Sequence, residues 1–195
     1  MSRLRSSHGI DDEAGFTLVE LLVVMALMLI VGSVVVSGIV SGLRASERGR
    51  ARVEALTDLE LAAERLARDL RFADPVDAAS DTQVIVNVLR DDAGTLVRHR
   101  VTFAVAGGTI TETRAVYDPP SSATATGTTV REVISDLDPA TTVFAFGTAD
   151  GQPWVPGDEL SDVAEIQLDL RRELPDQQPI EVETSVFVRN VRDGR

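Results

Sequence analysis

Few residues in this chain could do chemistry, and their types argue against most kinds of active site. The 195 residues include no cysteine and only two histidines, His8 and His99. Without cysteine there is no disulfide, thiolate nucleophile or zinc ribbon, and two histidines leave little for a metal site or a catalytic triad. The sequence has no serine–histidine–aspartate order, no glycine-rich phosphate loop and no H-E-x-x-H motif. We therefore predict a protein that is not an enzyme; an extracytoplasmic enzyme is an alternative without a supporting set of residues.

Carboxylates are the most abundant groups that could bind a ligand. The chain has 31 acids and 19 bases, all of them arginine, and residues 73–195 alone have a net charge of −11. This balance argues against nucleic acid as a partner, because the phosphates would be repelled. Clustered carboxylates could bind calcium, but neither candidate loop has EF-hand spacing, and an acidic surface also keeps an extracytoplasmic domain soluble. We predict no metal and no cofactor. The two loops contain Asp91, Asp92 and Gly94, and Asp158, Glu159 and Asp162.

A long apolar run near the N-terminus contains one acid at its head. The twenty residues from Leu21 to Val40 carry no charge, and as a helix they would span roughly 30 Å, the thickness of a bilayer's hydrocarbon core. A buried globular helix is an alternative. A cleaved secretory signal would have a shorter run and a small-residue cleavage site. We predict a retained membrane span. Glu20 then lies at its edge, where an acid needs a partner or the headgroup interface.

The residues around Glu20 resemble a known signal. The segment Ala14-Gly15-Phe16-Thr17-Leu18-Val19-Glu20-Leu21-Leu22 is similar to the class III signal of type IV prepilins and type II secretion pseudopilins. In that family a prepilin peptidase cleaves after the glycine and methylates the new terminal amine. The resemblance implies that residues 1–15 are a leader, that cleavage falls between Gly15 and Phe16, that Phe16 is N-methylated, and that Glu20 acts in assembly.

The spacing of these residues has a chemical reason. Glycine before the cut lets an extended backbone enter a protease site without a side chain in the way. Cleavage frees a cationic amine at Phe16, which the Glu20 carboxylate of a neighbouring subunit could approach in a filament. A buried ion pair of this kind fixes register better than it adds stability.

Two charge patterns depart from the family. The leader is net −1, where family leaders are usually basic, and more arginines follow the span than precede it, which favours the opposite membrane orientation. We give the cleavage motif more weight, because its residues are specific and the charge bias is statistical. The leader charges are Arg3, Arg5, Asp11, Asp12 and Glu13, and the arginines after the span are Arg44, Arg48, Arg50 and Arg52.

The helix is predicted to continue beyond the membrane. No proline occurs between Arg44 and Phe72, and apolar residues recur at gaps of 3 and 4, which makes one stripe on a helix. The stripe could pack on the chain's own sheet or form a coiled-coil seam with another subunit. Pro75 ends the helix. We predict one helix from Phe16 to Phe72, with a membrane span at 16–43 and an amphipathic continuation at 44–72. The stripe consists of Leu56, Leu59, Ala63, Leu66 and Leu70.

From Gln83 onward the apolar period is two, which indicates strands. Gly107-Gly108 marks a hairpin turn. Residues 73–195 are predicted to form an extracytoplasmic β-rich domain whose antiparallel sheet is covered by the helical stripe, an α+β fold. The expected strands are Gln83–Arg90, 97–105, Thr109–Val116, Arg131–Leu137, Thr142–Phe146, Val163–Arg171 and Ile180–Arg189.

The resemblance implies a minor pilin or pseudopilin that assembles into, or primes, a type IV pilus-like or type II secretion filament. Its implied partners are other pilin subunits, the prepilin peptidase, an inner-membrane assembly platform and the lipid bilayer, with the C-terminal domain outside the cytoplasm. Leu61–Arg71 (LAAERLARDLR) and Ser185–Val191 (SVFVRNV) are similar to J-type minor pseudopilins and PilW-like minor pilins. The alternative is an uncleaved, single-pass binding or sensor protein.

Overall fold

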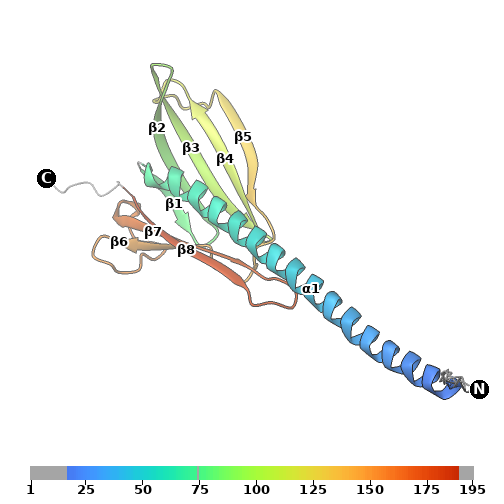
Figure 1. Ribbon diagram of the computed structural model, residues 1–195. Coiled ribbons are helices and arrows are strands. Elements are labelled where there is room, and N and C mark those ends of the chain that lie inside the picture. Colours follow the sequence, from blue (N-terminus) through green and yellow to red (C-terminus); the bar gives the residue numbers. More distant parts are fainter. Residues whose placement is uncertain (1–16, 74, 189–195) are drawn as a thin grey trace, which may run out of the picture. The chain divides into compact units, whose positions relative to one another are not determined.

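The described part of the protein consists of one long helix and antiparallel strands (Figure 1). The computed structural model describes residues 17–73 and 75–188. The helix packs against antiparallel sheets, so the predicted α+β fold class is confirmed. The elements are α1 (Leu18–Arg71), β1 (Val76–Ser80), β2 (Gln83–Asp92), β3 (Thr95–Ala106), β4 (Thr109–Tyr117), β5 (Gly127–Ile134), β6 (Phe144–Thr148), the 3-10 helix η1 (Leu160–Asp162), β7 (Val163–Arg172) and β8 (Ile180–Phe187).

The chain divides after Glu47 into two units, and α1 contributes to both. In the first unit, α1 from Leu18 to Glu47 has exposed side chains at every position. In the second unit, the rest of α1 supplies one buried face to the core formed with the strands.

The strands of the second unit form two sheets instead of the single sheet predicted. The first is a five-stranded antiparallel meander in the order β1-β2-β3-β4-β5, and the second is three-stranded, in the order β6-β7-β8. The connection after β5 bonds to both: the Leu137 amide donates to the Gly108 carbonyl at 2.9 Å and the Asp138 amide to the Arg171 carbonyl at 2.8 Å. Periodicity within each strand could not reveal this change of sheet, because it depends on contacts distant in sequence.

The edge strands differ most from the prediction. β1 was not predicted, because VDAAS is short and has a single large apolar residue, Val76. β5 begins at Gly127, before the strand expected at Arg131–Leu137, because Thr128 and Thr129 pair with Ala115 and Arg114 of β4. Both strands are formed through their ladder partners more than through their own apolar pattern.

The buried face of α1 differs from the predicted stripe at one end. Leu59, Ala63, Leu66 and Leu70 are buried, whereas Leu56 is 38% exposed and its neighbour Ala55 is buried. A strict seven-residue repeat drifts by about 20° per heptad on a straight helix. Leu56 lies two heptads before Leu70, so this drift places it at the edge of the buried face. Leu59 lies eleven residues before Leu70 and stays on the face, since eleven residues nearly complete three turns.

Candidate functional site

The predicted cleavage and methylation residues, Gly15 and Phe16, lie outside the described residues. The structure begins beside them, at Thr17. The Thr17 hydroxyl accepts a hydrogen bond from the Glu20 amide at 3.2 Å, and its carbonyl accepts one from the Leu21 amide at 3.2 Å. Thr17 is therefore the N-cap of α1.

The position of Glu20 gives it a local role that the sequence analysis missed. Thr17 and Glu20 are an N-cap and its third helical residue, the spacing of a capping box, in which the acid can reach back to the N-cap amide. The signal T-x-x-E was present in the sequence. Glu20 is also the acid in the first turn of α1, where the helix dipole favours a negative charge. Its side chain is exposed and so remains available to another chain.

The first unit exposes a continuous apolar surface. Leu18, Leu29, Ile39 and Leu43 are each more than half exposed, and so are most of the large apolar residues between them. Soluble monomers rarely expose contiguous apolar patches beyond a few hundred Å². The helix is long and apolar enough to cross a membrane, and its most apolar window has no buried residue. A bilayer or the helices of other subunits would cover this surface.

A cluster of charges joins α1 to the first sheet in the second unit. Asp69, in the last turns of α1, accepts a hydrogen bond from Arg90 of β2 at 2.5 Å and pairs with Arg114 of β4. Glu112 of β4 pairs with Arg114 at 3.0 Å and with Arg131 of β5. Asp69 and Glu112 are 3% and 1% exposed. Each buried carboxylate therefore has two arginine partners, as a buried charge requires.

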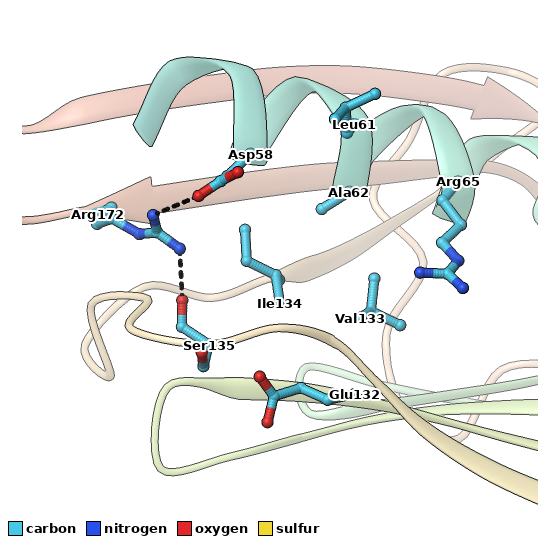
Figure 2. A pocket seen from close by; sticks show the side chains of 9 residues that line it. All are labelled: Asp58, Leu61, Ala62, Arg65, Glu132, Val133, Ile134, Ser135 and Arg172. Carbon is cyan, nitrogen blue, oxygen red and sulfur yellow. Dashed lines mark hydrogen bonds and ion pairs between the residues drawn. The ribbon is translucent and has the colours of Figure 1, made fainter. Parts of the chain in front are cut away.

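Two adjoining cavities follow α1 along β5. One, of about 320 Å³, is lined by apolar side chains of both elements, including Leu61, Ala62 and Val133 (Figure 2). At its other end Arg172 donates to Asp58 at 3.3 Å and to the Ser135 carbonyl at 2.7 Å. The second cavity, of about 460 Å³, is lined by the charge cluster. Arg65 lines both cavities. The two adjoining cavities are called here the α1–β5 groove.

His99 lies on the helix-facing side of β3, between Val88 and Val116 of the neighbouring strands. Its Nδ1 is buried without a hydrogen-bond partner among the described residues. Burial, together with the cations of Arg114 and Arg90, lowers the pKa of His99 below its usual 6.5. A neutral imidazole in this place is a packing residue.

The two predicted acidic loops use carboxylates to hold their own turns. Asp91 accepts a hydrogen bond from the Gly94 amide at 2.7 Å, and Asp158 accepts one from the Val155 amide at 3.2 Å. Trp154 is folded onto the domain: its ring meets Phe146 edge-on, and Nε1 donates to the Glu159 carbonyl at 3.1 Å. These loops are therefore structural in the described part of the chain.

A different set of acids is brought together by the second sheet. Asp169 of β7 faces Glu183 of β8, and Glu181 lies close to both. Burial and the two glutamates raise the pKa of Asp169 above its usual 3.8. Both glutamates are exposed, and exposed acids of this kind are common without a bound ion.

Comparison with known families agrees with the N-terminal geometry. Residues 11–36 match the family model of the prokaryotic N-terminal methylation motif. The match includes Gly15, Phe16, the Thr17 cap and Glu20, and it extends into the apolar part of α1. These residues carry the N-terminal motif of type IV pilin-like proteins, and the long helix packed on antiparallel sheets agrees with a pilin-like fold. Pilins are structural subunits, so the prediction that the chain is not an enzyme is confirmed. No curated protein matches the sequence.

Proposed function

We propose that this pilin-like protein is a minor subunit of a type IV pilus-like or type II secretion filament. The match of residues 11–36 to the methylation motif carries the proposal. A prepilin peptidase would cleave after Gly15 and methylate Phe16. The mature chain would be anchored in the inner membrane by residues 16–43 and continue through 44–72 into an extracytoplasmic domain of residues 73–195. Its partners would be other pilin subunits and the assembly platform.

The structure supports this function through the surface of α1. The apolar side chains from Leu18 to Leu43 are exposed, and they could contact lipid before assembly and other helices afterwards. Glu20, at the head of this surface, would pair with the Phe16 amine of a neighbour and set the register. The similarity of Leu61–Arg71 to J-type subunits favours a minor role over that of a major pilin.

Mass spectrometry of the mature N-terminus tests the proposal. In cells with an active prepilin peptidase we expect methylated phenylalanine at Phe16 and loss of residues 1–15. The variant Gly15→Leu should leave a precursor about 1.7 kDa heavier, from roughly 110 Da for each of fifteen leader residues. This precursor should still insert into the membrane, because the apolar run is unchanged. An intact Met1 in the wild type, or normal cleavage of Gly15→Leu, would overturn the assignment.

The alternative function is an uncleaved membrane-anchored binding protein. It requires the anchor and a ligand surface but neither cleavage nor Glu20. The same N-terminal measurement distinguishes the two, because only the filament subunit loses its leader.

A further inference from the structure

One half of the α1–β5 groove has an excess of arginines, on a chain whose net charge is −12. Its charged half is lined by five arginines and two carboxylates. Both carboxylates, Asp69 and Glu112, are already bridged by two arginines each. The arginines are Arg65, Arg68, Arg90, Arg114 and Arg131. The arginines therefore outnumber the carboxylates in this half of the groove. They lie close to one another and are partly shielded from water, which strengthens their attraction for a negative charge.

Two of these guanidinium groups keep donors for another molecule. Arg65 is half-buried and makes no hydrogen bond or ion pair with residues 17–73 or 75–188. In Figure 2 its side chain projects from α1 into the groove near Val133. Arg131 uses Nε and Nη2 on Glu112, which leaves Nη1 without a partner in the described part of the chain. Guanidinium groups bind carboxylates through two parallel hydrogen bonds.

Among residues 17–73 and 75–188, one wall of the groove is a sheet edge without a strand partner. β5 ends the five-stranded sheet, and its residues from Gly127 to Glu132 are exposed. An unpaired edge can accept an extended segment as an additional strand, with side-chain pockets giving specificity. The other half of the groove is lined by charged and apolar side chains, and its apolar ones supply such a pocket at Leu61, which is 60% exposed, and at Val133.

We propose that the α1–β5 groove docks an extended acidic segment of a neighbouring filament subunit. The segment pairs with the free edge of β5, its carboxylates bind Arg65 and Arg131, and an apolar side chain packs on Leu61. The inference deepens the proposed function and rests on it for the identity of the partner. Charge complementarity selects an acidic partner, because an arginine groove repels basic segments.

Photocrosslinking in cells tests the groove with the full chain. A photoreactive residue replaces Leu61 or Thr129, which line its two halves, and the crosslinked peptide is identified by mass spectrometry. We expect a peptide of another membrane-anchored subunit that contains at least two acidic residues. The same photoreactive residue at Val155, which is exposed in a loop away from β5, should not give this peptide.

Charge reversal then tests the chemistry. Arg65→Glu should lower the crosslink yield by roughly tenfold, because it places like charges together, and Arg65→Gln should lower it less. Arg71→Glu is the matched control: it makes the same charge change at an exposed position about 120° around the same helix and should keep the yield. Unchanged thermal unfolding of the variants excludes misfolding as the cause.

The possible outcomes separate this proposal from the proposed function. Suppose that Phe16 is methylated. The groove proposal alone is then overturned if neither position crosslinks, if the crosslinked peptide lacks acidic residues, or if Arg65→Glu leaves the crosslink yield unchanged. An intact Met1 overturns the proposed function, and with it the filament partner, whatever the crosslink shows. Restoring the yield of Arg65→Glu by changing an acid of the identified peptide to arginine would establish the contact.

Discussion

Asp69 and Glu112 are buried carboxylates whose charges are balanced by arginines from other elements. Arg90 and Arg114 reach Asp69 from β2 and β4, so one side chain near the end of α1 contacts two strands. Burying such a pair costs desolvation free energy that its attraction only partly offsets, whereas removing one partner leaves the other charge uncompensated. The cluster therefore defines where α1 lies on the sheet more than it raises net stability.

Asp69→Ala should lower the free energy of unfolding by about 3 kcal/mol, because Arg114, whose side chain is 16% exposed, would lose its partner on α1. The measurement is chemical unfolding of the full chain in detergent, followed by the fluorescence of Trp154, the only tryptophan. Glu64→Ala is the control: its pair with Arg68 is exposed at both ends and should be worth less than about 0.5 kcal/mol. Equal effects of the two changes would contradict this role of Asp69.

His99 should make stability depend on pH. Its folded pKa lies below 6.5 because of burial and the cations of Arg114 and Arg90. The unfolded chain therefore binds a proton first as the pH falls, so the stabilisation present above pH 6.5 is lost as the pH drops through the folded pKa. His99→Gln should show a smaller loss between pH 7 and pH 5. Parallel pH profiles of unfolding for the two proteins would exclude this effect.

At the scale of the element, the apolar spacing of α1 predicted most of its buried face but not the end of that face near Leu56. Its apolar residues predicted the buried face at Leu59, Leu66 and Leu70, since spacing alone places them on one side of a helix. Spacing did not place Leu56, because a heptad pattern does not show whether the helix is straight or supercoiled. The exposure of Leu56 and burial of Ala55 indicate a straight helix on a sheet.

Leu59→Ala should therefore cost about 2–4 kcal/mol of unfolding free energy, because Leu59 has no exposed surface and the change leaves a cavity. Leu56→Ala should cost less than about 1 kcal/mol, since Leu56 is already partly in solvent. The same denaturant titration measures both. If α1 were instead a coiled-coil seam with another subunit, the two costs would be similar and would depend on protein concentration.

The turn between β3 and β4 was predicted from Gly107-Gly108, and both residues have positive φ, 55° and 76°. A Cβ at Gly108 would meet the Leu137 carbonyl, whereas a Cβ at Gly107 would meet nothing. Gly108→Ala should thus cost about 1–3 kcal/mol, and Gly107→Ala roughly 1 kcal/mol. Thermal unfolding of the pair measures the difference. A cost at Gly107 equal to that at Gly108 would show that the contact with Leu137 does not matter.

Local patterns predicted the local features, and the rest depended on pairing between distant residues. The Gly107-Gly108 turn and the strands of alternating apolar residues are visible within a few positions. The charge cluster is not, because Asp69 and Arg114 are 45 residues apart and meet only through the register of β2, β3 and β4. No pattern in the sequence likewise indicates that Arg65 and Arg131 line the same cavity. The α1–β5 groove could therefore be found only in the structure.

At the scale of the whole molecule, the two units need different surroundings. The α1 segment from Leu18 to Glu47 exposes apolar side chains, which a bilayer or other helices would cover. Residues 73–195 carry a net charge of −11, which suits water and an extracytoplasmic position. Glu20 stands where the first of these surfaces begins, so under the proposed function it would decide how the subunit leaves the membrane for the filament.

Glu20→Leu should insert into the membrane at least as well as the wild type, because an acid is lost from the end of the span. Cleavage after Gly15 should survive, whereas crosslinking to other pilins should fail, because the Phe16 amine of the neighbour loses its counter-charge. Fractionation measures insertion, and crosslinking measures incorporation. Glu20→Asp, which keeps the charge on a shorter side chain, should be intermediate.

Glu20→Gln separates the charge from the cap of α1. Glutamine can replace glutamate in a capping box, so this variant keeps the helix start that Thr17 and Glu20 form but loses the carboxylate charge. We expect it to fail in incorporation as Glu20→Leu does, since an amide is a poor counter-ion for a buried amine. If Glu20→Gln crosslinks like the wild type while Glu20→Leu does not, Glu20 acts by capping the helix. If both crosslink normally, Glu20 is an interfacial carboxylate with no part in assembly.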